Sequence, residues 1–326
     1  MIRQLPSRRQ LVLGALGAPL ATAALAQPAY PNRPVRIVVP YAPGGGADIL
    51  ARAIGERLSE VWRQPVVVEN RPGAGGSVGT ETVARAQADG YTMLMASPSH
   101  SINPALYKNL PFDTLQAFTP ITIVASGPLV LVTNASAPFT GLRQLVDHAK
   151  ANPARVAYAS AGIGSSPHFA GELLSSLAGL QMTHVPYRGT GPALVDLMAN
   201  RVQMFFGPVP TILEHVRDGR LKALAVTTKT RFAALANVPS VAERGYPDYE
   251  LLQWWGLMVP AGTPAEVAGE QYTQVKRILE SPAMRERLAG LGAEPGGGAP
   301  AEFDALIRDE IQRWTRLVQT ANLTPE

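Results

Sequence analysis

Two segments of this chain share one unusual pattern: a short apolar strand, a glycine-rich turn, and then a helix rich in alanine and leucine. In the first segment, residues 35–39 lead into the turn at residues 41–48. In the second, residues 156–159 lead into the turn at residues 160–168. A helix that begins at such a turn leaves backbone N–H groups unpaired and carries about half a positive charge at its N-terminus. The pattern therefore predicts two anion-binding turns, and its repetition suggests one anion held from two sides.

Strand-like and helix-like segments alternate along most of the chain. This alternation predicts an α/β fold in which helices connect parallel strands. Strands are expected at residues 35–39, 66–69, 92–96, 129–133, 156–159, 182–185, 202–206 and 222–227, and helices at residues 49–61, 78–85, 141–150, 166–178, 190–199 and 209–218. From residue 263 onward the pattern predicts a tail of helices only, with a loop at residues 294–299, because Pro264, Pro282 and Pro300 each stand where a first helical turn would begin.

Two apolar segments interrupted by glycine, residues 124–132 and 251–259, are predicted to cross between two lobes. Two such crossings form a hinge about which the lobes can close with little backbone rotation. Domain 1 is then expected to comprise residues 27–127 plus 252–326. Domain 2 is expected to comprise residues 128–251.

The first 26 residues are predicted to be a secretory signal peptide rather than part of the fold. Arg8 and Arg9 precede an apolar run, and Ala24-Leu-Ala26 provides the small residues of a cleavage site. The paired arginines suggest the twin-arginine variety and a periplasmic destination. A membrane anchor is the alternative, but the apolar run is broken by glycine and proline and is shorter than the ~20 residues of a membrane helix.

The composition limits the kinds of molecule that the protein is expected to bind. The formal net charge of +4 falls to about +1 without the predicted signal peptide, which holds three arginines and no acidic residue. The remaining chain has no run of lysine or arginine, so a nucleic-acid partner is not expected. It also has no cysteine, which rules out disulfides and a lipid-modified N-terminal cysteine. We expect a monomer stabilised by burial of its core.

The two glycine-rich turns supply most of the predicted ligand contacts. Their glycines let the backbone approach a ligand closely, and serine hydroxyls can donate to a carboxylate. A histidine can donate as well, although a single histidine is more often structural. Tight turns without any ligand are the alternative interpretation. The residues selected are Tyr41, Ala42, Pro43, Gly44, Gly45 and Asp48 in the first turn, and Ser160, Gly162, Gly164, Ser165 and His168 in the second.

Two further segments directly follow predicted strands, which is where ligands bind in open α/β sheets. Ser97 and Ser99 follow the strand at residues 92–96. Tyr187, Arg188 and Gly189 follow the strand at residues 182–185. Arg188 is the one cationic residue in these two segments. An arginine that only faces solvent is an equally good interpretation.

A hydrolase is the enzyme alternative, with Ser77 or His168 as the catalytic residue. Gly75-Gly-Ser77-Val-Gly79 matches the nucleophile elbow of serine hydrolases, but residues 70–74 separate it from the preceding strand. We expect Ser77 or Thr80 to cap a helix instead. The histidines show no metal-binding spacing, and no complete nucleotide-binding glycine motif is present, so neither a metal nor a cofactor is expected.

Several further motifs occur in a fixed order along the chain. Those of the first half are Tyr30-Pro-x-Arg-Pro-Val-Arg36, Pro43-Gly-Gly-x-x-Asp48, Glu69-Asn-Arg-Pro-Gly-Ala-Gly-Gly76 and Asp89-Gly-Tyr-Thr92. Those of the second half are Gly162-x-Gly-Ser165, His184-Val-Pro-Tyr-Arg-Gly189, Val238-Pro-Ser-Val-Ala-Glu243 and Pro260-Ala-Gly-Thr-Pro264. Over residues 30–323 the chain thereby resembles the Bug-type extracytoplasmic solute receptors of tripartite tricarboxylate transporters.

The resemblance implies a two-lobed periplasmic binding protein of the type II, Venus-flytrap kind that binds without catalysis. It implies that backbone amides and waters at residues 42–45 and 162–165 hold a ligand's carboxylate, and that residues 97–99 and 187–189 are cleft loops. The ligand would be a di- or tricarboxylate or an aromatic acid, captured for membrane transporter subunits. A signalling protein as the membrane partner stays an alternative.

Two departures from the family pattern bear on the ligand. Family members often carry an aspartate in the segment that here reads Gln203-Met-Phe-Phe-Gly207. An acid there could meet an amino group, so its absence favours a ligand without one. Tyr41 stands where phenylalanine is usual and could add a hydroxyl donor.

Overall fold

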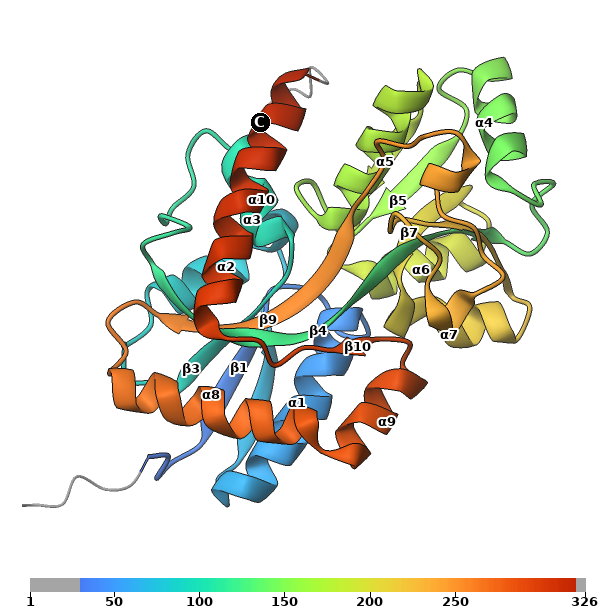
Figure 1. Ribbon diagram of the computed structural model, residues 1–326. Helices are drawn as coiled ribbons and strands as arrows, with labels where there is room; N and C mark the ends of the chain where they lie inside the picture. Colours follow the sequence, from blue (N-terminus) through green and yellow to red (C-terminus); the bar gives the residue numbers. More distant parts are fainter. Residues whose placement is uncertain (1–29, 321–326) are drawn as a thin grey trace, which may run out of the picture.

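The structure is a computed structural model that describes residues 30–320 (Figure 1), so the predicted signal peptide lies outside the described residues. The strands are β1 (Val35–Val39), β2 (Val66–Asn70), β3 (Thr92–Ala96), β4 (Phe118–Asn134), β5 (Ala157–Ser160), β6 (Thr183–Pro186), β7 (Met204–Pro208), β8 (Leu221–Val226), β9 (Leu252–Pro260) and β10 (Glu294–Pro295). The helices are α1 (Gly46–Trp62), α2 (Ser77–Ala84), α3 (Ser99–Leu106), α4 (Leu142–Ala151), α5 (Ser166–Ala178), α6 (Thr190–Met198), α7 (Val209–Arg217), α8 (Ala265–Glu280), α9 (Pro282–Gly290) and α10 (Pro300–Thr320), with short 3₁₀ turns at Ala74–Gly76, Ala233–Leu235 and Ala242–Arg244.

The strands form one hydrogen-bonded order, β2-β1-β3-β9-β4-β7-β5-β6, with β8 and β10 also paired to β4. Strands β1 to β3 are parallel in one half of the molecule, and β5 to β7 are parallel in the other. Figure 1 shows the two halves side by side. The predicted two-lobed α/β architecture is therefore confirmed.

Helices cover both faces of each group of parallel strands. In the first half, Ile37 of β1 packs toward α1, α8 and α9, whereas the next residue, Val38, packs toward α2 and α10. In the second half, α4 and α5 cover one face and α6 and α7 cover the other. Burial on both faces explains why these strands are nearly continuous apolar runs without alternation.

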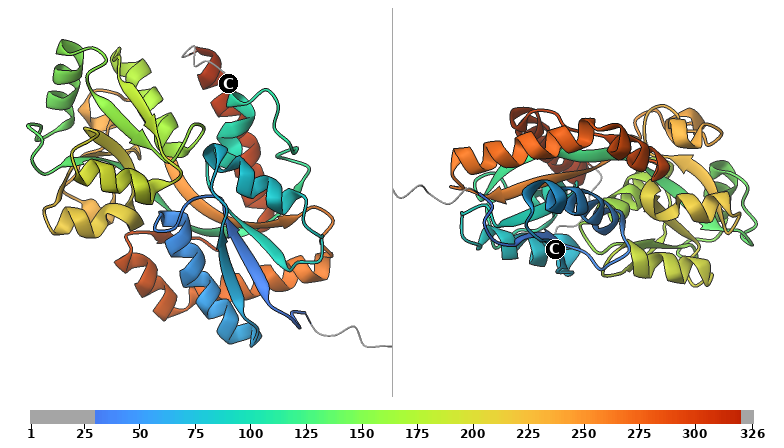
Figure 2. Two further views of the ribbon diagram at one scale, coloured as in Figure 1. Left: turned by 180° about the vertical axis from the view of Figure 1, so that it is seen from behind. Right: turned by 90° about the horizontal axis from the view of Figure 1, so that it is seen from below.

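The centre of the sheet differs from the all-parallel sheet that the alternation predicts. Strand β4 spans residues 118–134 and not only 129–133, and the predicted crossing at 251–259 is largely the strand β9. Residues 118–128 of β4 pair with β9, and residues 129–134 pair with β7 and β8, all antiparallel. Figures 1 and 2 show both strands running through the middle of the molecule. Because the two long strands run in opposite directions, the sheet is mixed.

Two smaller elements also departed from expectation. The predicted loop at residues 294–299 contains the short strand β10, which pairs with β4. Helix α3 was not predicted, because its sequence contains an internal proline and few strong helix formers. Tertiary packing holds it in place: Ile102 and Leu106 are buried, and Ser101 donates a hydrogen bond to Glu310 of α10.

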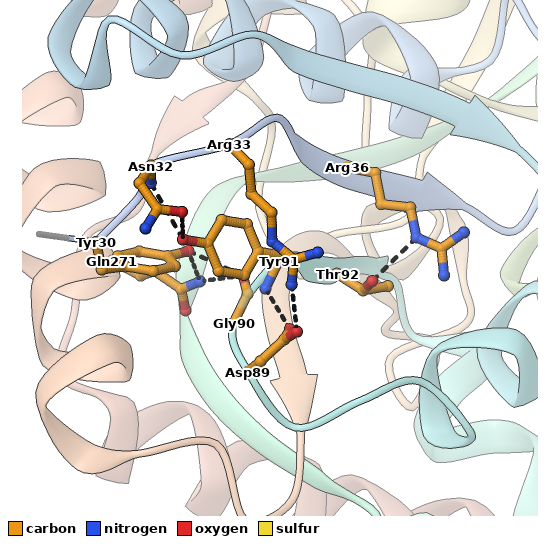
Figure 3. Close-up of polar contacts among 9 residues, drawn as sticks. All are labelled: Tyr30, Asn32, Arg33, Arg36, Asp89, Gly90, Tyr91, Thr92 and Gln271. Carbon is orange, nitrogen blue, oxygen red and sulfur yellow. Dashed lines mark hydrogen bonds and ion pairs between the residues drawn. The ribbon is translucent and has the colours of Figure 1, made fainter. Parts of the chain in front are cut away.

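The start of the described chain is fastened to the sheet by polar contacts, shown in Figure 3. The Tyr30 hydroxyl donates to the carbonyl of Gly90 at 2.8 Å and accepts from Gln271 of α8 at 2.6 Å. The guanidinium of Arg33 lies 4.1 Å from the centre of the Tyr91 ring. The motifs at residues 30–36 and 89–92 therefore meet here, and their role is structural.

The adjacent tryptophans of β9 face opposite sides of the sheet, as strand geometry requires. Trp254 packs edge-on against Phe303 of α10, with ring centroids 5.1 Å apart, and its indole N–H donates to Glu310 at 3.1 Å. Trp255 faces α1 instead, and a Cβ added at Gly46 would lie 2.7 Å from its ring.

Within residues 30–320, no helix combines the length and the apolar character needed to cross a membrane.

Glu310 is a buried carboxyl between α10, α3 and β9. Burial raises its pKa from 4.5 to about 7, against the opposing effects of hydrogen bonds from Ser101 and Trp254 and the charge of Arg313. The folded protein therefore holds this proton up to about pH 7, whereas the unfolded chain releases it near pH 4.5. The contribution of Glu310 to stability is full below pH 4.5 and decreases as the pH rises toward 7.

We predict that Glu310→Gln stabilises the protein at pH 8 and changes its stability little at pH 4.5. The glutamine oxygen can still accept from Trp254, and its amide can donate to Ser101 Oγ, whose own proton can go to the carbonyl of Pro98. It has no proton to lose. An increase in Tm of about 2–4 °C at pH 8 is expected for each kcal/mol gained. Thermal unfolding at both pH values measures this, with Glu286→Gln on the exposed surface of α9 as the control. An equal effect at both pH values would contradict the prediction.

Candidate ligand-binding site

A pocket lies between the two halves of the molecule, where the predicted turns meet. Its empty space, including the opening, is about 350 Å³. The lining residues are Tyr41, Gly45, Gly46, Ala47, Ser97, Ala161, Ser165, Ser166, Pro167, Thr190, Pro208, Gln253 and Trp255.

Several helices begin at this pocket. Gly46 is the first residue of α1, Ser166 of α5 and Thr190 of α6, while Pro208 directly precedes α7. A helix start leaves backbone N–H groups without helical partners and carries about half a positive charge. In α5, however, Pro167 has no N–H, and the N–H of His168 donates to Ser165 Oγ. Among the described residues, no charged side chain lines the pocket. The backbone dipoles of these helix starts therefore favour an anion in the pocket.

Three hydroxyl groups form a cluster on one wall of the pocket. Ser97 Oγ lies 2.9 Å from Ser99 Oγ and 3.3 Å from the Tyr41 hydroxyl, which also contacts Ser99. The Tyr41 hydroxyl donates to the carbonyl of Gly75 at 3.2 Å, and burial raises its pKa, so it remains protonated. Ser97 can accept from Ser99 and direct its own proton into the pocket. Three of the predicted residues are thus brought together, and Ser97 is the one whose proton is left for a ligand.

The first turn presents different amides from those predicted. The N–H of Gly44 donates to Asp48 at 3.0 Å, and the N–H of Ala42 donates to the carbonyl of Arg188 at 3.0 Å. Pro43 and Gly44 are exposed and do not line the pocket. Because α1 begins at Gly46, three residues earlier than expected, Gly46 and Ala47 line the pocket together with the predicted Gly45.

Asp48 braces the first turn from outside the pocket. Burial alone would raise the pKa of its carboxyl, but hydrogen bonds from Arg52, the amide of Gly44 and Asn70 hold it below its ordinary value. The side chain of Asn70 also donates to the carbonyl of Tyr41 at 3.0 Å. Asp48 therefore shapes the turn and is not among the residues lining the pocket.

The second turn likewise uses two of its predicted amides internally. The N–H of Gly162 donates to Ser160 Oγ at 3.0 Å, and the N–H of Gly164 donates to His168 Nδ1 at 3.3 Å. Ser165 donates to the carbonyl of Gly162 at 2.6 Å. Ser165 and Ser166, at the start of α5, are what this turn presents to the pocket.

A pair of stacked histidines supports the second turn from behind. The rings of His168 and His184 lie 4.2 Å apart, and His184 Nε2 lies 2.6 Å from Ser160 Oγ. Burial lowers the pKa of His168 to about 4 and that of His184 to about 3, so both are neutral at pH 7. Since Nδ1 of His168 accepts from Gly164, this histidine positions the turn through the nitrogen that faces it.

The remaining predicted residues lie farther out along the seam between the halves. Tyr187, Arg188 and Gly162 line a second, outer cavity of about 690 Å³ including its opening. Gly189 precedes α6, and a Cβ added to it would lie 3.0 Å from the N atom of Ala42. The structure thus separates the predicted residues into an inner pocket, an outer cavity and a supporting layer.

Sequence reasoning missed several residues of the inner pocket. Gln253 and Trp255 lie on β9, and their spacing of two residues places them on one face of that strand. Ser166 donates to Gln253 Oε1 at 2.5 Å, which joins α5 to β9. The sequence of β9 has no polar–apolar alternation and predicts only a crossing, so the directions of these side chains follow from its pairing with β3 and β4.

The two halves touch around both cavities. Tyr107, directly after α3, donates its hydroxyl proton to the carbonyl of Ile163 at 3.0 Å. A Cβ added to Gly75 would lie 1.8 Å from that same carbonyl oxygen, and one added to Gly164 would lie 2.3 Å from Asn103 Oδ1. These contacts leave no room for a side chain at either glycine.

The predicted alternatives at Ser77 and the histidines are not supported by contacts. Ser77 begins α2, but its hydroxyl accepts from Asn103 at 3.2 Å and is not the helix cap, which is Gly76. Thr80 donates back to the carbonyl of Gly76 and is not the cap either. Within residues 30–320, no group of three or more histidine or acidic side chains could hold a metal ion.

Comparison with known proteins places this geometry in a family. The model of the tripartite tricarboxylate transporter family receptor matches residues 50–323. Protein BugT of Bordetella pertussis is 38% identical over 314 residues, covering 94% of this chain and 96% of BugT.

Two solved structures are similar over nearly the whole described fold. The periplasmic binding protein BugD is 34% identical, with a TM-score of 0.88, covering 91% of this chain and 100% of BugD. Rpa4515 of R. palustris, solved with adipate, is 36% identical with a TM-score of 0.88 and the same coverage, 91% and 100%. The chain belongs to the family of tripartite tricarboxylate transporter receptors.

Proposed function

We propose that the protein captures a small organic carboxylate in the inner pocket and delivers it to membrane transporter subunits. One observation carries this proposal: helices from both halves begin at a pocket that has no charged side chain among the described residues. Such a pocket favours an anion and offers nothing to neutralise a cation. The adipate bound to the similar protein Rpa4515 supports the same class of ligand.

Uncharged hydrogen-bond donors are sufficient for micromolar affinity. A hydrogen bond to a charged group contributes about 1.5–3 kcal/mol. Micromolar binding requires about 8 kcal/mol. A handful of donors from Ser97, the amides at residues 45–47 and the start of α5 therefore accounts for such affinity, provided that closure removes water from the pocket.

The proposed mechanism is closure of two lobes on the ligand. We assign one lobe to residues 27–127 plus 252–326 and the other to residues 128–251, with β4 and β9 as the hinge. The ligand would contact both lobes and so favour their closed arrangement, which is a shift of population and requires no covalent step. Transporter subunits would then recognise the surface that closure completes.

The proposal places the protein in the periplasm as a monomer without cofactor, exported by the signal peptide at residues 1–26. A membrane signalling protein as the partner is the second candidate. Catalysis finds no support in the contacts of the serines: Ser160 pairs with His184 at 2.6 Å, but it is fully buried and lines neither cavity.

The ligand class is tested by comparing adipate with its neutral diamide, adipamide. We predict that adipate raises the Tm increasingly as its concentration exceeds Kd, and that adipamide does not. Ser97→Ala should weaken adipate binding about ten- to hundredfold in calorimetry, because one donor to a charged group is lost. Ser175→Ala, whose hydroxyl bonds only to Gly171 within α5, is the control. Equal binding of acid and amide would refute a carboxylate site.

Closure is tested at Gly75. Gly75→Ala places a methyl group against the carbonyl of Ile163 in the other half, so we predict at least tenfold weaker ligand binding with both lobes still folded. Gly179→Ala is a matched control, because Gly179 has a similar φ of 62° against 58° for Gly75, and no atom lies within 4 Å of its added Cβ. Equal affinity of the two variants would contradict the need for this contact.

A further inference from the structure

We infer that Trp314 of α10 is a positioning residue for ligand capture. Its packing against Phe169 of α5 joins the two lobes outside the inner pocket and favours their closed arrangement for every ligand alike. This inference rests on the proposed function, because it needs lobes that close on a ligand. It adds an apolar contact that regulates closure without touching the ligand.

The first turns of α10 belong to the first lobe. Phe303 and Ile307 lie in the apolar core of that lobe together with Trp254. Glu310, one turn further on, accepts hydrogen bonds from Trp254 and from Ser101 of α3. The strand β10, which precedes α10, pairs with the first part of β4. When the lobes move, α10 should therefore move with the first lobe.

The last turns of α10 pack into the second lobe. Trp314 and Val318 share an apolar cluster with Tyr158 of β5 and with Phe169 and Leu173 of α5. The rings of Trp314 and Phe169 meet edge to face with centroids 5.1 Å apart, and their side chains are 1% and 0% exposed. Figure 1 shows the end of α10 at the level of α5. One helix thus contributes side chains to the cores of both lobes.

The contact between α10 and α5 is made where the lobes would separate. The chain enters α10 from the first lobe, so side-chain packing holds the helix end to α5. A groove of about 470 Å³ including its opening runs beside this contact, lined among others by Leu173, Trp314 and Leu317. Solvent therefore already reaches one side of this interface.

Opening of the pocket should break the same contact. Helix α5 begins at the inner pocket with Ser166, and Phe169 follows three residues later. If the second lobe moves as a rigid body, a movement that takes Ser166 away from the first lobe also takes Phe169 away from Trp314. The ligand and this ring contact therefore favour the same arrangement of the lobes.

The ring contact affects affinity through the population of the closed arrangement. Edge-to-face aromatic pairs are favourable beyond their buried area, and exposing both rings to water is costly. The apparent affinity of a ligand is its intrinsic affinity multiplied by the fraction of protein in the binding arrangement. Loss of the contact should thus weaken all ligands by one common factor. A lost pocket donor, such as that of Ser97, would weaken different ligands by different factors.

The test measures adipate and succinate binding by calorimetry and stopped-flow kinetics in Trp314→Leu and in Phe169→Leu. We expect both acids to bind about three- to tenfold more weakly, by the same factor, mainly through faster dissociation. The double variant should lose less than the product of the two single factors, because both changes remove one contact. Small-angle X-ray scattering of the ligand-free variants should show a larger radius of gyration than that of wild type.

Phe303→Leu is the matched control. Phe303 is also buried on α10 and meets a tryptophan ring edge to face, with centroids 5.1 Å apart, but that partner is Trp254 within the first lobe. This variant should lower the Tm and leave both affinities within about twofold of wild type, since it spares the contact between lobes.

Unchanged affinity in folded Trp314→Leu and Phe169→Leu would overturn the inference, as would unequal factors for the two acids or an equal loss in Phe303→Leu. If neither ring variant folds, Val318→Ala makes a smaller change in the same cluster and is judged by the same criteria. Failure of wild type to bind either acid would instead refute the proposed function.

Discussion

The structure depends on helix N-termini that converge on one pocket. Buried N–H groups without partners are costly unless a ligand or water satisfies them. Here α1 supplies them from one half, and α5 and α6 supply them from the other. The alternation of strand and helix achieves this, because each of these helices begins where a parallel strand ends. The fold thereby directs helix N-termini, which favour an anion, into one pocket that no charged side chain of residues 30–320 lines.

The antiparallel strands β4 and β9 give this arrangement its frame. Both halves are built on them, since β4 pairs with β9 along its first part and with β7 and β8 along its last. The alternation along β9 directs Trp255 to the pocket and Trp254 to α10. The same strand therefore lines the candidate site and anchors the C-terminal helix, so the site and the core share one support.

The sequence predicted the parallel strands, most helices and both glycine-rich turns, because local patterns determine these features. It did not predict which amides face the pocket. Those of Gly44, Gly162 and Gly164 are paired with nearby side chains, and that of Ala42 is paired with the distant Arg188. Such pairings depend on side-chain placement and on contacts between remote segments. Helix α3 was missed for a related reason, since packing stabilises it against its own composition.

An attraction built from peptide dipoles has a consequence for how the pocket responds to acidity. Peptide groups do not titrate, and the two histidines behind the second turn remain uncharged down to about pH 4. Within residues 30–320, the side chains that line or support the inner pocket therefore keep their charge between about pH 5 and pH 8. Release of a bound carboxylate at low pH would then begin with protonation of the carboxylate itself. A ligand with a low pKa would stay bound at a pH that releases a ligand with a higher pKa.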